Sequence, residues 1–449
     1  MKRYLGNKQF YKKTLIIALP IMAQQFIATF VNLIDNIMIG SIGGIALTSV
    51  TMANRFYLIF NSTLFGIGGA AGIFIAQFYG AKEKEKCQKA FDISLVWAGL
   101  MAIVFTAVLF FVPQLVIEVF SKSPEIVSEG VRYLEYAKYT YFPFAVSFTC
   151  MMALRAVGIN MIQLKVGVVA VIINTALNYC LIFGNFGFPM LGVKGAAIAT
   201  AIARVVEMCL YLLIMYRNKH FFSLRLHGLL HRDKHLTEGL FKRAVPLTIN
   251  EVLFSSGQSM VYKSYVRTDE YLVAAVSVVD TVANILFVVF SGLSSAVSIL
   301  IGNTLGANKI EEAKDNARKL IMFGVIIAVG LGSVSFLMSG YIPNFYNVAS
   351  DIKDTIVILL RIKSIMIIIY AVNVCIFFVL RAGGDIVSTL IMDSGFLWVG
   401  GVFVSTLLSI NLGLPLVMLY AIVESLDIIK LFVAFHFFKK EKWAKNITT

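Results

Sequence analysis

The sequence predicts an all-α integral membrane protein with twelve transmembrane helices, arranged in two six-helix lobes that are related by a parallel pseudo-twofold repeat. Three observations predict this fold. The 449-residue chain is 59% hydrophobic and only 14% charged, whereas soluble domains carry about 25% charged residues. Apolar windows of about 20 residues, each long enough to cross a bilayer, recur along almost the whole chain. The third observation is that the second half of the sequence repeats the first.

The apolar windows form two groups of six. In the first lobe we expect helices at about residues 14–39, 46–78, 90–112, 131–157, 163–184 and 193–216. In the second lobe we expect them at about residues 241–265, 271–304, 319–341, 354–381, 387–410 and 416–438. The first window follows Lys2 and Arg3 directly, without the pattern of a cleavable signal peptide. Since six is even, the second lobe enters the membrane in the same orientation as the first, which makes the repeat parallel.

The repeat is visible when the chain is shifted by 226 residues. The matching pairs include Pro20 and Pro246, Gly66 and Gly292, Gly80 and Gly306, Arg155 and Arg381, Gly158 and Gly384, Gly187 and Gly413, and Pro189 and Pro415. Glycine and proline mark kinks, caps and turns, so this match predicts two units of the same backbone shape. Many secondary transporters are built from two copies of one membrane unit.

The net charge of +14 is distributed as in a membrane protein rather than a nucleic-acid-binding protein. Basic residues gather at the two ends of the chain and in alternate loops, such as 82–89 and 309–319, whereas the loops at 41–45 and 411–415 carry no charge. This is the positive-inside pattern. We therefore expect a multi-pass protein of the plasma (inner) membrane with both termini in the cytoplasm, and no nucleic-acid partner.

The longest polar connection divides the chain into domains. We expect an N-lobe at residues 1–215, a cytoplasmic linker at 216–240 and a C-lobe at 241–449. The linker holds four of the five histidines (His220, His227, His231 and His235). Such a cluster can bind metal or sense pH, but contact of a basic linker with anionic headgroups is the favoured interpretation. The five cysteines are scattered and indicate packing residues rather than a disulfide or metal framework.

Asp35 is the most informative polar residue within a predicted helix. It lies about 33 Å beyond Lys13 along the first helix, in the outer half of the membrane. An aspartate deep in a membrane helix costs about 2.5–3.5 kcal/mol, so it persists where it pairs, faces water or has a function. Gln25, Asn32 and Asn36 fall on or beside the same stripe of the helix. We expect this polar stripe to line a cavity.

Further polar residues lie in the fifth and sixth helices. Asn174 and Asn178 share one face of the fifth helix, and Thr200 follows a run of small residues in the sixth. Together with Asp35 they offer oxygen atoms for a hard monovalent cation such as Na⁺, or a proton site. Spacing alone leaves open whether the two asparagines bind an ion or only hold helices together.

The second lobe carries its own acidic residues within predicted helices. Glu251, Asp280 and Asp393 are candidates for substrate binding or ion coupling. Two pairs of opposite charge stand three residues apart, Arg204 with Glu207 and Asp427 with Lys430. In each pair we expect the acid and the base to neutralise one another.

Several short motifs, in order along the chain, resemble the multidrug and toxic compound extrusion (MATE) family, in its NorM-like and DinF-like branches. They are Ala18-Leu19-Pro20, Val31-Asn32-Leu33-Ile34-Asp35, Ile75-Ala76-Gln77-Phe78-Tyr79-Gly80-Ala81-Lys82, the stretch from Asn174 to Gly184, the run at 192–197 and Leu380-Arg381-Ala382-Gly383-Gly384-Asp385. The resemblance covers the full length, and it implies the same twelve-helix, two-lobe fold.

The resemblance also implies cation-coupled efflux. Asp35 matches the helix-one aspartate on which proton or sodium coupling centres in that family, and Asn174 and Thr200 match residues beside it. Asn178 departs from the DinF-like branch, which tends to carry a second aspartate there, and this puts pure proton coupling in doubt. Glu251 lies in the helix where some members use a glutamate, about one turn early.

We therefore expect a monomeric antiporter, driven by H⁺ or Na⁺ and without another cofactor, that exports small amphiphilic, cationic compounds. One alternative is a flippase for a lipid or lipid-linked sugar on the same fold, which would need more internal basic residues than Arg55, Arg204, Lys263 and Lys430. The other is a membrane-embedded transferase, which would need a catalytic motif in a loop. We expect no enzyme, because the sequence lacks the GxSxG, HExxH and P-loop patterns.

Overall fold

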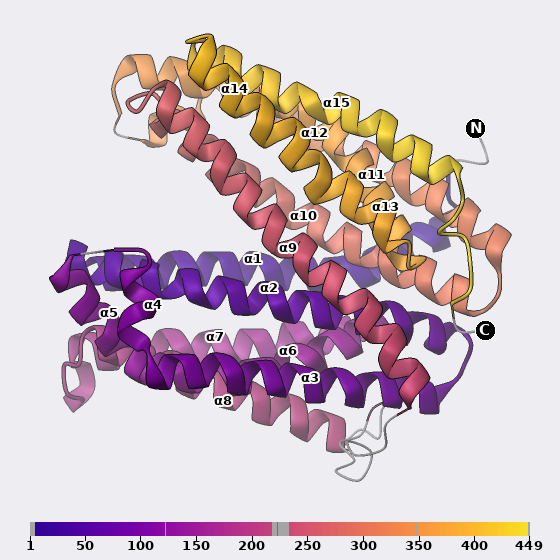
Figure 1. The fold of residues 1–449 in the computed structure, drawn as a ribbon, viewed down its shortest axis with the longest axis horizontal. Helices are drawn as coiled ribbons and strands as arrows, with labels where there is room; N and C mark the ends of the chain where they lie inside the picture. The colour runs from indigo at the N-terminus through magenta and orange to yellow at the C-terminus, as the bar shows by residue number, and fades with distance from the viewer. Residues whose placement is uncertain (1–4, 122, 218–221, 223–232, 347, 448–449) are drawn as a thin grey trace. The chain divides into compact units, whose positions relative to one another are not determined.

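The computed structural model describes residues 5–121, 123–217, 222, 233–346 and 348–447. All the regular secondary structure within these ranges is helical, as Figure 1 shows. This finding confirms the all-α class predicted from the apolar windows. Three of the linker histidines, His220, His227 and His231, lie outside the described residues.

The first half of the chain forms eight α-helices and two short 3₁₀ turns among the described residues. They are α1 (Lys8–Gly40), α2 (Gly44–Gly80), α3 (Lys84–Phe111), α4 (Pro113–Glu118), α5 (Pro124–Ala137), η1 (Lys138–Thr140), α6 (Tyr141–Ala156), α7 (Asn160–Phe183), η2 (Asn185–Gly187) and α8 (Val193–Arg217). The predicted fourth span is therefore α5 and α6 joined through η1.

The second half of the chain has a matching order. Its elements are α9 (Lys234–Thr268), α10 (Val273–Gly306), α11 (Ile310–Met338), η4 (Ile342–Phe345), α12 (Ser350–Ala382), α13 (Ile386–Leu390), η5 (Ile391–Gly395), η6 (Leu397–Val402), α14 (Phe403–Asn411) and α15 (Leu416–Lys439). The segments η5 and η6 are π-helical and join α13 and α14 into the predicted eleventh span. α9 begins earlier than predicted, because the side chain of Asp233 accepts a hydrogen bond from the backbone N–H of Leu236 at 3.1 Å and caps the helix.

The helices have the length and composition of membrane spans. Within the described residues, nine of them are long and apolar enough to cross a bilayer. The other three predicted spans have identifiable reasons for a weaker signal. α6 has only 16 residues because η1 precedes it, α9 is rich in polar residues, and α15 carries Glu424, Asp427 and Lys430. Within the part of the chain that the structure describes, the helices thus follow the predicted order of twelve spans, six in each half of the sequence.

The 226-residue repeat is also present in the backbone. Left-handed φ angles occur at Lys82 (62°) and Asn308 (59°), at Gly158 (82°) and Gly384 (76°), and at Gly187 (80°) and Gly413 (53°). Each pair is separated by 226 positions. Left-handed backbone is uncommon outside glycine, so its recurrence at Lys82 and Asn308 marks the same turn built twice.

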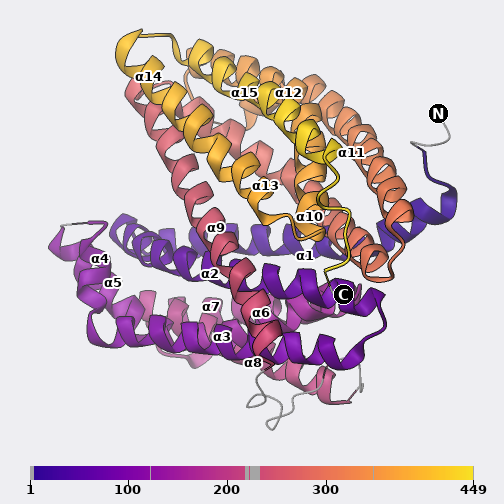
Figure 2. The ribbon, with the colours of Figure 1, turned by 45° about the vertical axis from the view of Figure 1, so that its right-hand side comes forward.

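The described chain divides into two compact units. One consists of residues 23–248 and the other of residues 1–22 together with 249–449. α1 and α9 are therefore each shared between the units, and the lobe limits at 215 and 240 stay predictions. Within each unit the helices run alongside one another, as α11, α12 and α15 do in both views (Figures 1 and 2).

Two glycines show how the shared helices are held. A Cβ added at Gly66 of α2 would lie 2.6 Å from the Cα of Thr248 in α9. A Cβ added at Gly292 of α10 would lie 2.7 Å from the carbonyl oxygen of Ala18 and would also contact Met22, both in α1. Gly66 and Gly292 are repeat partners, and so are Met22 and Thr248. The same close contact is therefore built once in each unit.

The core of each unit is apolar and rich in aromatic side chains. In the unit of residues 23–248, the ring of Phe60 packs 4.8 Å from Tyr141 and 5.1 Å from Phe105, centroid to centroid. In the other unit, Trp443 is fully buried, and Gly383 leaves room for its backbone. These cores fix the helices that carry the polar residues described next.

Candidate functional site

Asp35 lies in the last part of α1 and is hydrogen-bonded to α7. Its Oδ1 accepts a hydrogen bond from Nδ2 of Asn178 at 2.8 Å. Asn178 is only 1% exposed, so the acidic side chain has one buried amide as its partner. The structure thus brings together two predicted site residues that are 143 positions apart in the chain.

The hydrogen bonds continue from α7 to α8. Nδ2 of Asn178 also donates to Oδ1 of Asn174 at 3.3 Å, and Nδ2 of Asn174 donates to Oγ1 of Thr200 at 3.3 Å. The hydroxyl of Thr200 in turn donates to the carbonyl oxygen of Ala196 at 2.9 Å. The four residues proposed from the sequence for the ion site therefore form one series of hydrogen bonds across three helices. We call Asp35, Asn178, Asn174 and Thr200 the polar network.

The polar network lies on the wall of a cavity of about 470 Å³ in the unit of residues 23–248. Residues of α1, α2, α5, η1, α6, α7 and α8 line this cavity. Its polar lining consists of Gln24, Asn32, Asp35, Asn36, Asn54, Tyr57, Tyr133, Thr140, Tyr141, Asn174, Asn178, Thr200, Arg204 and Glu207. A cavity of this size and mixed lining can hold a small organic molecule.

The stripe on α1 differs from the predicted one by a single residue. Asn32 and Asn36 line the cavity, but the glutamine that does so is Gln24. Gln25, which we predicted to line a cavity, is exposed. The reason is helical geometry: three turns back from Asp35 is about 10.8 residues, which reaches Gln24, whereas Gln25 is rotated about 100° away.

Two charged cavity residues were interpreted from the sequence only as a neutralising pair. Nη1 of Arg204 lies 2.7 Å from Oε2 of Glu207, one turn along α8, which confirms the pair. The guanidinium group also lies over the ring of Phe144 in α6, at 4.7 Å from its centroid. The spacing of the two residues predicted the ion pair but did not indicate that both line the cavity. Their position in the sixth predicted helix, four and seven residues beyond Thr200, was the available signal.

The oxygen atoms of the polar network suit a hard monovalent cation. A carboxylate, two amide oxygens and a hydroxyl are the kinds of ligand that such cations take. Oδ1 of Asn178 is buried and has no hydrogen-bond partner, so it remains free to serve as a ligand. The carboxyl group of Asp35 can alternatively take up a proton. Within the described residues there is no group of three or more His, Cys, Asp or Glu side chains that could hold a metal ion.

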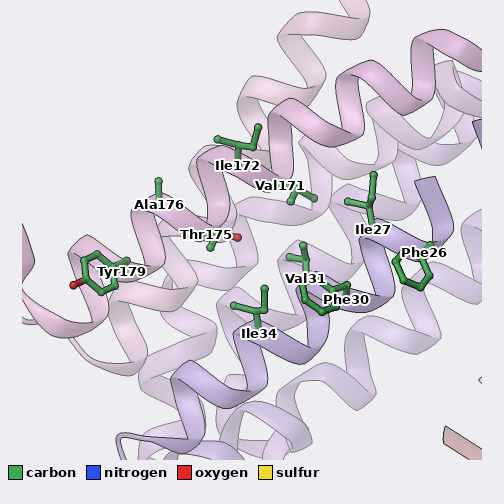
Figure 3. A pocket seen from close by; sticks show the side chains of 10 residues that line it. All are labelled: Phe26, Ile27, Phe30, Val31, Ile34, Val171, Ile172, Thr175, Ala176 and Tyr179. Atoms are coloured by element: carbon green, nitrogen blue, oxygen red, sulfur yellow. The ribbon is translucent and has the colours of Figure 1, made fainter. Parts of the chain in front are cut away.

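An apolar hollow of about 500 Å³ lies beside the cavity, between α1 and α7. Figure 3 shows its side chains on the two helices, among them Phe26, Phe30 and Ile172. Ile27, Val31 and Val171 line both the hollow and the polar cavity. These side chains therefore form the partition between apolar surface and polar interior.

The acidic candidates of the second half occupy separate positions in the other unit. Glu251 forms an ion pair with Arg381, with Oε1 at 3.1 Å from Nη1. Asp393 lies in the π-helical segment η5, where it accepts a hydrogen bond from Nδ2 of Asn250 at 2.9 Å and lies 3.7 Å from Nζ of Lys430. Asp280 lies on an exposed position of α10.

One ion pair inside this unit was missed by sequence analysis. Nζ of Lys363 in α12 lies 2.7 Å and 3.0 Å from the two carboxylate oxygens of Glu424 in α15. The two side chains are only 18% and 14% exposed. A lysine in the middle of the apolar window at 354–381 was the signal that could have indicated it. Lys430, expected to neutralise Asp427, is paired with Asp393.

Comparison with known proteins relates this chain to membrane transporters. The MatE family model matches residues 20–180 and again residues 246–403, so the two matches begin 226 residues apart. The probable multidrug resistance protein YoeA of Bacillus subtilis is 27% identical over 293 residues, which cover 65% of this chain and 63% of that protein. The aligned part of YoeA is thus less than two thirds of its length. The uncharacterized transporter YisQ of B. subtilis is 24% identical over 88% of this chain and 87% of its own.

Solved structures share the fold. A MOP superfamily transporter from Pyrococcus furiosus superposes with a TM-score of 0.87 at 16% identity, over 98% of this chain and 97% of that one. The MATE transporter VcmN of Vibrio cholerae superposes with a TM-score of 0.88 at 17% identity, over 96% of this chain and 97% of that one. At these identities the likeness establishes the architecture, and the role of each residue has to be argued from this chain.

Proposed function

Since this chain belongs to the MATE family of multidrug transporters, whose model matches both of its halves, we propose that it is an antiporter that exports small amphiphilic cations in exchange for H⁺ or Na⁺. MATE is a family of transporters rather than of enzymes, so the proposal concerns binding and exchange instead of covalent chemistry. We place the coupling ion at Asp35, with Asn178, Asn174 and Thr200 as its surroundings.

The observation that carries this proposal is the polar network on the cavity wall. A carboxylate within a membrane helix is costly unless it has partners or a function. Asp35 has one hydrogen-bond donor, Asn178, and faces a cavity of about 470 Å³. A purely structural aspartate would be expected to have its oxygens fully paired and to adjoin no cavity. Asp35 is therefore available to a ligand that arrives from outside.

Antiport follows if the coupling ion and the substrate compete for the same charge. When a proton or Na⁺ occupies Asp35, the carboxylate no longer attracts a cationic substrate, and the substrate is released. Exchange of this kind drives transport only if the ion binds the two conformations with different affinity. Exchange of one H⁺ or Na⁺ for one monovalent organic cation moves no net charge, so the concentration gradient of the ion supplies the energy. A ten-fold ion gradient is worth about 1.4 kcal/mol and sustains a substrate gradient of at most about ten-fold.

The cavity lining supports the choice of substrate. Asp35 and Glu207 supply negative charge, and Tyr57, Tyr133 and Tyr141 supply aromatic faces. Aromatic rings bind organic cations through their negative faces. Two of the relatives are named as probable multidrug resistance proteins, and this supports a small organic molecule as the substrate. We expect the chain to function as a monomer, because one copy holds the whole polar network.

The proposed location is the plasma membrane with both termini in the cytoplasm. The alternating distribution of basic residues between loops supports this orientation. A flippase for lipid-linked sugars is less well supported, because it would need free internal cations to bind a pyrophosphate. The cavity wall carries one basic residue, Arg204, which is already in an ion pair with Glu207, and a second acid, Asp35.

The proposal is tested by efflux from proteoliposomes. A fluorescent organic cation is loaded, and a pH gradient or a sodium gradient is imposed in separate experiments. We expect the wild type to respond to one of the two gradients and Asp35→Asn to lose at least nine tenths of that response. The substitution keeps the size of the side chain while it removes the charge, so each hydrogen bond in the network retains a partner.

Asp354→Asn is the matched control. Asp354 is an exposed residue of α12, and the same chemical change there should leave efflux unchanged. A response that survives in Asp35→Asn would move coupling to an acid of the second unit, with Glu251 and Asp393 as the next residues to change. If wild type responds to neither gradient, antiport of organic cations is excluded.

A further inference from the structure

Arg204 is a fixed positive charge inside a cavity that we assign to cations. It lines the cavity together with Asp35 and Glu207. Its side chain is 33% exposed and that of its partner Glu207 is 12% exposed. A transporter of cations has no evident need for a guanidinium group at this position, so its presence calls for a physical explanation.

The position of the guanidinium group is fixed by two contacts. Nη1 pairs with Glu207 at 2.7 Å, and Cζ lies over the ring of Phe144, 4.7 Å from its centroid. An ion pair within one helix turn and a cation–π contact with a second helix both favour a single side-chain orientation. The positive charge therefore remains part of the cavity wall instead of moving with the ligand.

The charges of the cavity can be counted from its lining. Asp35, Glu207 and Arg204 are the lining residues that carry a charge at neutral pH. Two acids and one base give the cavity a formal charge of −1 when Asp35 is ionised. Without Arg204 the charge would be −2, and without Glu207 it would be zero.

The repeat places a second cation at the same position of the other unit. Lys430 stands 226 residues after Arg204, in α15, and pairs with Asp393 at 3.7 Å. The side chains of Lys430 and Asp393 are each 17% exposed. A basic residue paired with an acid is thus a feature of both copies, although the partner acid comes from a different helix in each.

We propose that Arg204 is a specificity-determining residue, which sets the formal charge of the cavity at −1 and so limits it to one positive charge at a time. This inference rests on the proposed function, because it takes the cavity as the cation site. The class of substrate that follows is the organic monocation. A dication would leave one uncompensated charge in a region of low dielectric constant, which is costly.

The test compares a monocation with a dication of the same aromatic system. Ethidium carries one permanent charge and propidium carries two. Their equilibrium binding to purified protein in lipid nanodiscs is measured by fluorescence anisotropy for the wild type, Arg204→Gln, Glu207→Gln and the double variant Arg204→Gln/Glu207→Gln. The cavity charges of these four proteins are −1, −2, 0 and −1.

The proposal predicts that the binding ratio follows the cavity charge. The ratio of propidium to ethidium affinity should rise at least ten-fold in Arg204→Gln, the equivalent of about 1.4 kcal/mol. It should fall in Glu207→Gln and return to the wild-type value in the double variant. Arg204→Lys, which keeps the charge, should also behave like the wild type. Arg204→Gln alone leaves Glu207 unpaired and can fail to fold for that reason. In that case Glu207→Gln, with a cavity charge of 0, is compared with the double variant, with a cavity charge of −1, and the affinity ratio should be lower in Glu207→Gln.

Two results would overturn the inference. One is a ratio that stays constant across the four proteins while Asp35→Asn weakens both dyes, and this would leave the proposed function intact. The other is a double variant whose affinity ratio stays as far from the wild-type value as the ratio of Arg204→Gln does. This result would mean that Arg204 acts through a direct contact with the dye instead of through the charge of the cavity. If Asp35→Asn leaves the binding of both dyes unchanged, the cavity is not the cation site and the proposed function fails as well.

Discussion

At the scale of single residues, the polar network has a defined direction. Asn178 donates to Asp35 and to Asn174, Asn174 donates to Thr200, and Thr200 donates to the backbone of Ala196. Each side chain of α7 in the network therefore depends on the next one for its orientation. The hydroxyl of Thr200 anchors the series, since a backbone carbonyl has a fixed position.

Thr200→Val removes the hydroxyl while it keeps the shape of the side chain. Hydrogen bonds between membrane helices contribute about 0.6 kcal/mol on average, so the thermal midpoint of unfolding should fall only slightly. A hydrogen bond to a charged group is worth more, about 1.5–3 kcal/mol, and we expect an oxygen ligand of a bound ion to contribute a comparable amount. We therefore expect gradient-driven efflux to fall about ten-fold or more, and Thr200→Ser to retain it. Equal losses of stability and transport in Thr200→Val would show that the residue is only structural.

Sequence reasoning identified the members of the polar network but not all residues around it. Asp35 and the asparagines were recognisable because polar residues within apolar windows are costly and stand out. Gln25 was predicted in place of Gln24 because the i, i+7 and i+11 spacing joins Gln25 to Asn32 and Asn36, whereas three whole turns back from Asp35 lead to Gln24. The contribution of Arg204 to the cavity depends on Phe144 and on helices far away in the chain, which spacing within one helix does not reveal.

At the scale of helices, the approach of α8 to α7 determines whether the network can form. A Cβ added at Gly195 would lie 2.6 Å from the carbonyl carbon of Leu181, so α8 begins in direct contact with the end of α7. Glycine allows helices to approach this closely in membranes. This contact holds Thr200, about one turn and a half beyond Gly195 in α8, within hydrogen-bond distance of Asn174.

Gly195→Ala should therefore force α7 and α8 apart. Overpacking of this kind costs about 1–3 kcal/mol, which should lower the thermal midpoint of unfolding, and efflux should fall because the distance from Thr200 to Asn174 increases. Gly330→Ala in α11 is the control, since a Cβ there meets nothing within 4 Å. It should be neutral or slightly stabilising. A Gly195→Ala protein as stable as the control would contradict the tight contact.

Other features of single helices were outside the reach of sequence patterns. The π-helical segments at Ile391–Gly395 and Leu397–Val402 interrupt an otherwise continuous apolar window, and Asp393 lies in the first of them. π-Turns often occur at functional sites, but apolar periodicity does not indicate them. The 3₁₀ turn at Lys138–Thr140, which joins α5 to α6, was hidden for the same reason.

At the scale of the whole molecule, the repeat was the strongest prediction from the sequence. Glycines and prolines matched without a gap, and the structure places left-handed residues at three pairs of the matched turns. The sequence did not predict that the compact units exchange helix ends. Residues 1–22 pack with the C-terminal unit, and the first part of α9 packs with the N-terminal unit. The cause is tertiary contact, at Gly66 with Thr248 and at Gly292 with Met22.

This exchange predicts that cutting the linker will not separate the halves of the protein. A protease site inserted after His227 yields two fragments on cleavage, and each fragment has one helix end packed in the unit formed mainly by the other. We expect the fragments to co-elute in mild detergent on size-exclusion chromatography, with efflux retained. The close contacts at Gly66 and Gly292 make dissociation costly, because each buries α1 or α9 against the backbone of a partner helix.

Gly292→Leu should weaken the association of the fragments, since the new side chain would displace Met22 and Ala18. Gly72→Ala should leave the association unchanged, because a Cβ at Gly72 meets nothing within 4 Å. Fragments that separate readily in the Gly72→Ala protein would show that the units are held by the linker instead of by the exchanged helix ends.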